Sequence, residues 1–311
     1  ALPIWSCGAK DKIDYQFLDT LPRYHEIMSY VDAVGTEFDF LDKKFTAWYL
    51  GRIRNYVQGN YPSYAYLPDS IMSYPTIFKD TTEYCYVENF LSEFKKQKHV
   101  RPFHHERLKP SFTQELIEAF KELRNMVHEP NDSTKKADII DYGIYTHAKE
   151  MGKRMIAMET TEYEIDLTER TDSSNAVAGN MPTQAHSLYE YCMMESGDTV
   201  NVLEEYAGGM VSFYKQGDLE GMLSESKSME SRIKQEQPEM EHFDSWQTEL
   251  TLGRNTMWMP VIITNIQQCS CLIAVGALHL PGEDGLITML RKEGYKVTPV
   301  DIHDKKNAIN Q

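Results

Sequence analysis

One histidine, His279, stands in a sequence context that suits chemistry. It comes three residues after Gly276, at the end of an apolar run, and the turn signal Pro281-Gly282 follows it. A nearby glycine lets the backbone approach a ligand, and a neutral imidazole can hold a metal ion or accept a proton. The alternative is a histidine bonded to a loop carbonyl, and the spacing alone favours that alternative.

Four charged residues could complete such a site. Glu37 could bind a metal ion or act as a general base on water. Arg254 could stabilise an oxyanion or bind a substrate carboxylate. Asp39 could orient Glu37, and Asp39 and Glu159 are candidates for substrate binding.

Each of these residues also has a plain alternative. Glu37 could be an exposed carboxylate at a strand end, and Asp39 could simply start the following turn. Glu159 could cap the turn after its strand. Arg254 could form a surface ion pair near a helix start.

Three short apolar runs predict the strands that would position these side chains. The runs are residues 33–38, 153–160 and 272–275, and the candidate acids and His279 stand at or just after their C-terminal ends. In open α/β sheets, ligands bind outside the carboxyl ends of the strands. We therefore expect these side chains to converge on one edge of a sheet.

Helix and strand signals alternate along the chain, which predicts an α/β fold. We expect a central mixed or parallel sheet, flanking helices and a largely helical insertion, in one domain of residues 1–311. Mainly helical segments at 42–135 and 183–268 would cover the sheet edge, and residues 269–303 would form a strand–loop–helix–strand unit. The predicted helices are 18–31 (after an initial turn), 44–57, 81–96, 111–127, 138–151, 200–216, 219–235, 255–268 and 286–292.

Three further segments have specific predictions. Ser111 and Gln114 form a capping-box pattern at a helix start. Residues 128–136 are typical of a linker and 168–182 of a polar loop. After Gly294, which is placed to cap the last helix, residues 295–300 predict a returning strand.

Composition excludes some classes of function. The 311 residues carry 47 acidic and 32 basic side chains, a formal charge of −15, which repels phosphate backbones and argues against nucleic-acid binding. No apolar run reaches the roughly 18 residues that cross a bilayer. Five scattered cysteines do not form a disulfide framework. We expect a soluble protein, located in the cell envelope or secreted if an upstream signal was removed.

Four blocks of the sequence resemble the TraB/PrgY/GumN family, which includes the Tiki metalloproteases. "VGALHLPGEDGLITMLRKEGYKV" is similar to the C-terminal signature of the family, a Gly-x-x-His motif, a Pro-Gly turn, a short helix and a Gly-Tyr-x-Val strand. "VDAVGTEFDF" resembles its strand ending in a Glu-x-Asp pair, and "IIDYGIYTHAKEMGKRMIAMET" the helix and strand that lead into a Leu-Glu-Thr-like turn. "LGRNTMWMPVI" resembles the Arg-Asn that opens the helix before the final motif.

The resemblance implies a fold similar to that of Tiki, the erythromycin esterases and the ChaN-like proteins. In Tiki-like members, two Gly-x-x-His histidines and acidic residues hold a divalent metal ion such as Mn, Co or Zn at one sheet edge and cleave peptides. His279 matches the second histidine, Glu37 the acidic site position and Arg254 the arginine. Bacterial relatives are linked to peptide-pheromone shutdown and to polysaccharide gene clusters.

One element of the family pattern is missing. The first Gly-x-x-His should precede the strand of Glu37, but Gly8 is followed three residues later by Asp11. The second motif reads His279-Leu280-Pro281 and the sequence opens on Ala1-Leu2-Pro3. We therefore expect Ala1 to follow directly after the first histidine, so that the metal site is incomplete in these residues.

Three functions remain open from the sequence. The first is a metal-dependent hydrolase of the TraB/GumN/Tiki type, acting on a peptide or small-molecule substrate, with Glu37, His279 and Arg254 as catalytic residues and Glu37 and His279 as metal ligands. The second is a non-catalytic protein that binds a peptide or signal. The third is an esterase that works without metal through a histidine-activated water.

Overall fold

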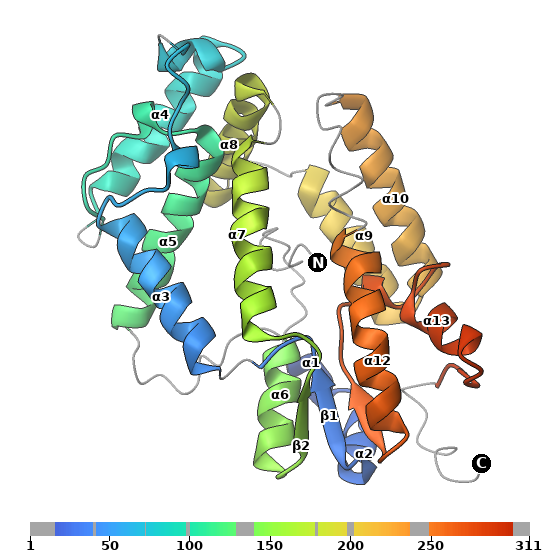
Figure 1. Ribbon diagram of the computed structural model, residues 1–311. Coiled ribbons are helices and arrows are strands. Elements are labelled where there is room, and N and C mark those ends of the chain that lie inside the picture. Colours follow the sequence, from blue (N-terminus) through green and yellow to red (C-terminus); the bar gives the residue numbers. More distant parts are fainter. Residues whose placement is uncertain are drawn as a thin grey trace.

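The computed structural model describes residues 16–39, 42–71, 73–97, 100–128, 140–177, 180–197, 202–236 and 249–300. A small parallel sheet lies at one end of a mostly helical structure (Figure 1). The predicted α/β class with a large helical insertion is confirmed. The α-helices of the described ranges are α1 (Gln16–Asp19), α2 (Pro22–Tyr30), α3 (Lys43–Val57), α4 (Thr81–Lys95), α5 (Pro110–His128), α6 (Ile140–Glu150), α7 (Thr161–Val177), α8 (Met181–Ser196), α9 (Val202–Gln216), α10 (Leu219–Glu236), α12 (Arg254–Ile266) and α13 (Leu286–Lys292).

The sheet has three parallel strands in the order β2-β1-β3. They are β1 (Ala33–Thr36), β2 (Arg154–Ala157) and β3 (Cys271–Ile273), so the three predicted strands are found. The central strand β1 is buried along its whole length, as expected for a parallel strand covered on both faces. Gly35 allows close packing there, because a Cβ on it would lie 2.7 Å from Ile273 Cδ1.

Helices cover both faces of the sheet. On one face, apolar side chains of α2 and α6, with Val211 of α9, pack against Val34. On the other face, Trp258, Met259 and Ile262 of α12 pack with Leu286 of α13. Because β1 lies between the other two strands and beneath both layers of helices, it is the most buried of the three strands.

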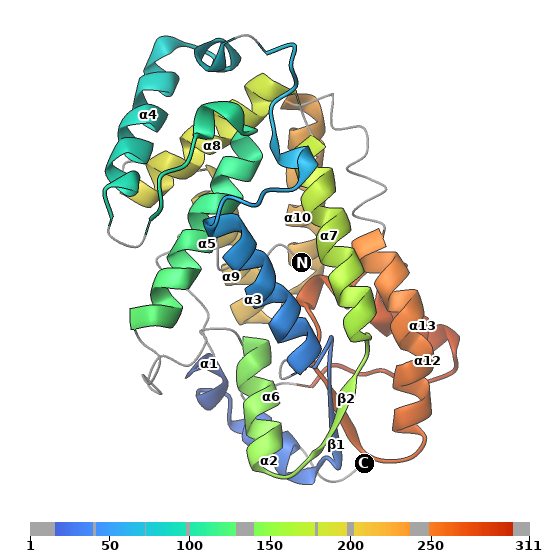
Figure 2. The same ribbon diagram turned by 60° about the vertical axis from the view of Figure 1, so that its left-hand side comes forward.

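The helical lobe, formed by α3, α4, α5 and α8, has a core of its own. Leu91, Phe112, Leu116 and Leu188 are completely or almost completely buried within it. Figure 2 shows that α3 of this lobe and the neighbouring α7 both run down toward the sheet end. Among the described residues, no helix is long and apolar enough to cross a membrane.

Two sequence predictions about secondary structure are wrong. Residues 168–177, expected as part of a polar loop, belong to α7. This helix has almost no apolar face, but it contacts α3 and α5, and an Arg170–Asp166 pair at i, i+4 links its turns. Tertiary contacts therefore stabilise a helix that the sequence pattern does not indicate.

The second error is the returning strand. Residues 295–300 join no strand in the described part of the chain. Gly294 does end α13, with a positive φ of 88°, and its N–H donates to the carbonyl of Arg291 at 3.0 Å. The chain then runs along α13, where Arg291 Nη2 donates to the carbonyl of Val297 at 3.0 Å, so that the sheet ends at β3.

Smaller predictions have mixed outcomes. Helix α5 begins at Pro110, one residue before Ser111, so Ser111 is inside the helix and not at the capping position predicted for it. Its Oγ donates instead to Gln184 Oε1 of α8 at 3.0 Å and so links two helices. Most of the predicted linker, residues 129–136, lies outside the described residues.

Candidate functional site

The carboxyl ends of the three strands meet at one edge of the sheet. Glu37 directly follows β1, Glu159 comes two residues after β2, and His279 lies in a short 3-10 turn after β3. Backbone bonds continue past the strands, because the N–H of Glu159 donates to the carbonyl of Glu37 at 2.9 Å. Parallel strands thus deliver residues from distant parts of the chain to the same place.

Arg254, the first residue of α12, joins the acidic residues of this edge. Its Nε donates to Glu159 Oε1 at 2.6 Å, and its Nη2 donates to Glu37 Oε2 at 2.6 Å and to Glu159 Oε2 at 3.1 Å. Glu164 Oε1 lies 3.8 Å from the same Nη2. We call Arg254, Glu37, Glu159 and Glu164 the Arg254 cluster. Arg254 and Glu159 are buried, so this is an interior ion network rather than a surface pair.

Three carboxyl groups around one guanidinium cannot all ionise without cost. Burial, a hydrogen bond with Glu159 and the charge of Glu159 raise the pKa of Glu164 to about 8. Burial also opposes ionisation of Glu37, but Arg254 and the Gly276 N–H outweigh it and lower the pKa of Glu37. At neutral pH, Glu37 is therefore ionised and Glu164 holds a proton.

Glu37 is also linked to the loop that carries His279. The N–H of Gly276 donates to Glu37 Oε1 at 2.8 Å, and the N–H of His279 donates to the carbonyl of Gly276 at 2.9 Å. One oxygen of the Glu37 carboxylate thus binds α12 and the other binds the loop after β3. These two hydrogen bonds hold the Glu37 side chain in one orientation.

His279 is buried and lies against α12. Its Nδ1 lies 2.8 Å from Asn255 Oδ1, and its ring centroid is 4.5 Å from that of Trp258. Burial lowers the pKa of His279 to about 3; the charge of Glu37 opposes this shift, and the charge of Arg254 adds to it. The imidazole is neutral across the physiological pH range.

Trp258 connects the two halves of the site. Its indole Nε1 donates to Glu159 Oε1 at 2.8 Å, and the Arg254 guanidinium lies 4.7 Å from its ring centroid. The same residue therefore contacts the Arg254 cluster and His279. Arg254, Asn255 and Trp258 lie on the buried face of α12, where i and i+4 positions are neighbours.

The structure thus brings together Glu37, Glu159, Arg254 and His279, four of the five residues singled out from the sequence. The fifth, Asp39, is exposed and accepts a hydrogen bond from Tyr145 of α6. Glu164, Asn255 and Trp258 also belong to the site, although the sequence pattern did not single them out as site residues. Asn255 and Trp258 follow Arg254 at i+1 and i+4, and this spacing is the signal that could have identified them.

Residues 104–106, a His-His-Glu run, have no part in this site. His105 is buried in the helical lobe. Its Nδ1 lies 2.6 Å from Lys95 Nζ and its Nε2 lies 2.5 Å from Glu88 Oε1. The run contributes an internal polar contact between helix α4 and the segment before α5.

The residues of the sheet edge fit a metal site in part. Neutral imidazole and ionised carboxylate are the forms that bind divalent ions, and His279 and Glu37 are in those forms. However, the described ranges contain no group of three or more His, Cys, Asp or Glu side chains placed to hold an ion. His279 and Glu37 can therefore provide two ligands of a metal site, not the whole set.

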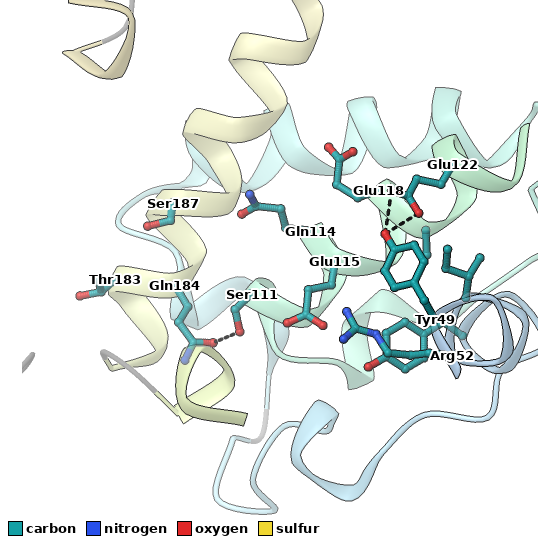
Figure 3. Close-up of a pocket in the computed structure, with 13 residues that line it drawn as sticks. Tyr49, Arg52, Ser111, Gln114, Glu115, Glu118, Glu122, Thr183, Gln184 and Ser187 are labelled. Atoms are coloured by element: carbon teal, nitrogen blue, oxygen red, sulfur yellow. Dashed lines mark hydrogen bonds between the residues drawn. The ribbon is translucent and has the colours of Figure 1, made fainter. Parts of the chain in front are cut away.

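A separate cavity of about 440 Å³ lies between α3, α5 and α8. Figure 3 shows Glu115, Glu118 and Glu122 of α5 on one side of it and Tyr49 and Arg52 of α3 on another. The Tyr49 hydroxyl donates to Glu122 at 2.7 Å. No residue that lines this cavity belongs to the Arg254 cluster, so it is a second, independent feature.

Comparison with known proteins identifies a family. The model of the TraB/PrgY/gumN family matches residues 82–299. The matched region includes Glu159, Arg254 and His279, whereas the strand of Glu37 precedes it. No curated protein and no solved structure matches the chain.

Proposed function

The chain belongs to the TraB/PrgY/gumN family, and from this premise we propose that it is a metal-dependent hydrolase that cleaves peptides at the sheet edge. Glu37 and His279 would bind the metal ion, and Arg254 would hold Glu37 in place. Glu159 would support Arg254 from the opposite side.

The observation that carries this proposal is the link between Glu37 and two distant segments. Its carboxylate bonds Arg254 at the start of α12 and the Gly276 N–H in the loop before His279. A ligand or base held at both oxygens is preorganised, which reduces the cost of arranging the site during reaction. A carboxylate that served only solubility would be exposed, whereas the Glu37 side chain is partly buried and bonded at both oxygens.

The state of His279 supports a ligand role over a base role. A base whose pKa is about 3 accepts a proton poorly near neutral pH, which disfavours the metal-free esterase. A metal ligand, in contrast, must be neutral before it binds. A divalent ion held there would supply a polarised substrate carbonyl and an activated water.

The protein residues around this pair have their own tasks. Arg254, which is bonded to two carboxylates, serves as the residue that orients Glu37 rather than as a free oxyanion donor. Glu164, with its raised pKa, holds a proton next to Glu159 at neutral pH. The buried Trp258 packs against both Arg254 and His279, and it would exclude water from the side of each residue that it covers.

The test uses the full-length gene product, purified without chelator, together with the variants His279→Ala and Glu37→Gln. We expect bound metal and peptide cleavage in the unchanged protein, and loss of both in the two variants. His104→Ala is the matched control, because the His104 side chain is exposed in the helical lobe. Absence of bound metal together with equal activity of all four proteins would refute the proposal.

The cavity of the helical lobe supports a second candidate, a protein that binds a peptide or signal without cleaving it. Its volume is within the range of ligand sites, about 300–1,000 Å³, and its lining includes hydroxyl, amide, carboxyl and guanidinium groups. These groups could pair with the polar atoms of a peptide. The cavity lies apart from the Arg254 cluster, so binding there needs no metal.

The two candidates differ in their response to a chelator and to cavity filling. Peptide binding that persists in chelator, and that Gln114→Trp abolishes by filling the cavity, would favour the binding protein. Turnover that a chelator abolishes, and that Gln114→Trp leaves intact, would favour the hydrolase.

A further inference from the structure

Asn255 is a completely buried polar residue next to the candidate site. Its side chain makes three hydrogen bonds, and all of them reach the loop after β3. Nδ2 lies 3.1 Å from the carbonyl oxygen of His279 and 2.8 Å from that of Asp284. Oδ1 lies 2.8 Å from Nδ1 of the His279 ring.

These contacts fix the orientation of the amide. A backbone carbonyl can only accept a hydrogen bond, and the amide NH₂ has two hydrogens to donate. Both hydrogens of Asn255 are therefore used by the carbonyls of His279 and Asp284. If the amide were flipped, its oxygen would face two carbonyl oxygens, and three acceptors would meet without a hydrogen.

The orientation of the amide then determines where the ring proton of His279 lies. The amide oxygen is only an acceptor, so Nδ1 must donate to it. A neutral imidazole has one ring proton. With that proton on Nδ1, the lone pair is on Nε2, and Asn255 makes no hydrogen bond to that nitrogen.

We propose that Asn255 is a positioning residue, which holds His279 in the Nδ1–H tautomer and so presents Nε2 as the ligand atom. Trp258, on the next turn of α12, also packs against the imidazole, with the two ring centroids 4.5 Å apart, and so helps to hold the ring in place. Bound histidine ligands commonly donate their second ring N–H to a fixed acceptor. The role of Asn255 in catalysis rests on the proposed function, whereas the assignment of the His279 tautomer does not.

The tautomer can be measured directly in the unchanged, full-length protein. Two-bond ¹H–¹⁵N spectra at neutral pH distinguish protonated from unprotonated ring nitrogens, and His279→Gln identifies the resonances of His279. We expect Nδ1 to carry the proton and Nε2 to be unprotonated. A proton on Nε2 would overturn the proposal, and this measurement needs no Asn255 variant to fold.

Variants then test whether Asn255 is the cause. Asn255→Leu removes the acceptor, and we expect the ring proton to redistribute toward Nε2. Asn255→Asp keeps an acceptor for Nδ1–H, and we expect it to restore the original tautomer. Asn265→Leu is the matched control, since Asn265 lies on the same helix and its Nδ2 donates to the carbonyl of Val261. An unchanged tautomer in Asn255→Leu would contradict the proposal.

A titration with Zn²⁺ alone separates this inference from the proposed function. We expect Zn²⁺ to perturb the Nε2 resonance, and Asn255→Leu to weaken binding about 10–100-fold, as is typical for the loss of a group that orients a ligand. If the protein shows the Nδ1–H tautomer but binds neither Zn²⁺ nor, in parallel titrations, Mn²⁺ or Co²⁺, the tautomer assignment is supported and the metal-dependent function is refuted. Zn²⁺ binding with equal affinity in both proteins would contradict the positioning role.

Discussion

Nη2 of Arg254 lies 2.6 Å from Oε2 of Glu37, although 217 positions separate these residues in the sequence. The same guanidinium binds both oxygens of Glu159. One buried cation therefore holds the loops after β1 and β2 against the first turn of α12, and the removal of that cation provides the first test of the cluster.

Arg254→Met should destabilise the protein by about 3–5 kcal/mol, because the buried carboxylate of Glu159 and the partly buried carboxylate of Glu37 lose their partner. Unfolding in urea measures the effect. Arg170→Met is the control, since the Arg170–Asp166 pair is on the surface of α7 and a pair of this kind is worth about 0–1 kcal/mol. Similar losses in both variants would mean that the Arg254 cluster has no special stabilising role.

Trp258→Phe should cost about 1–3 kcal/mol, because the buried oxygen of Glu159 loses the indole N–H. The matched control is Trp48→Phe. Trp48 Nε1 donates to Glu169 at 3.2 Å on the exposed side of α3, where water can replace the bond. We expect the stability of this control to change by less than about 0.5 kcal/mol. Equal effects would argue against a buried hydrogen bond at Glu159.

Glu164→Gln should change how stability depends on pH. Glu164 ionises at about pH 4.5 when unfolded, but at about pH 8 when folded. Between these values the unfolded state releases a proton that the folded state keeps, so the unchanged protein loses stability as pH rises through this window. The glutamine does not titrate.

The stability of Glu164→Gln relative to the unchanged protein should therefore rise from about pH 4.5 to pH 8 and level off above it. Urea unfolding at several pH values measures the difference. A constant difference between the two proteins would show that Glu164 has an ordinary pKa.

Gly285→Ala should destabilise the loop that carries His279. A Cβ at Gly285 would lie 2.2 Å from the carbonyl oxygen of Pro281 and 2.3 Å from that of Leu280, so backbone would have to move. We expect a loss of about 1–3 kcal/mol. Gly51→Ala in α3 is the control, because a Cβ at Gly51 would meet nothing within 4 Å. This substitution should raise the stability of the protein by about 0.5–1 kcal/mol. A neutral Gly285→Ala would show that the loop can adjust.

The sequence indicated the sheet edge well, because strand ends are marked by short apolar runs followed by charged residues. Glu37, Glu159 and His279 could be placed there from pattern alone. Glu164 could not, because its raised pKa arises from burial and from Glu159, and both act on it only after folding. Asn255 likewise shows its role only when α12 lies against the loop after β3.

Local pattern also failed where tertiary contacts decide the structure. The polar residues 168–177 have the composition of a loop, but contacts with α3 and α5 accompany the helix α7. Residues 295–300 have the alternation of a strand, but the described structure provides no edge with which they pair. Asp39 has the same local context as Glu37, yet it lies on the exposed side of the chain and bonds Tyr145.

The order of the strands has a consequence for biosynthesis. β1 is central, but its neighbour β3 comes much later in the sequence, and Asp32 bonds Ser270 across 238 positions. A chain that emerges N-terminus first cannot complete this sheet until β3, Cys271–Ile273, has left the ribosome. Long-range parallel pairing of this kind is slow, and unpaired edges aggregate. The candidate site therefore cannot form around Glu37 before the segment with Arg254 and His279 has been synthesised.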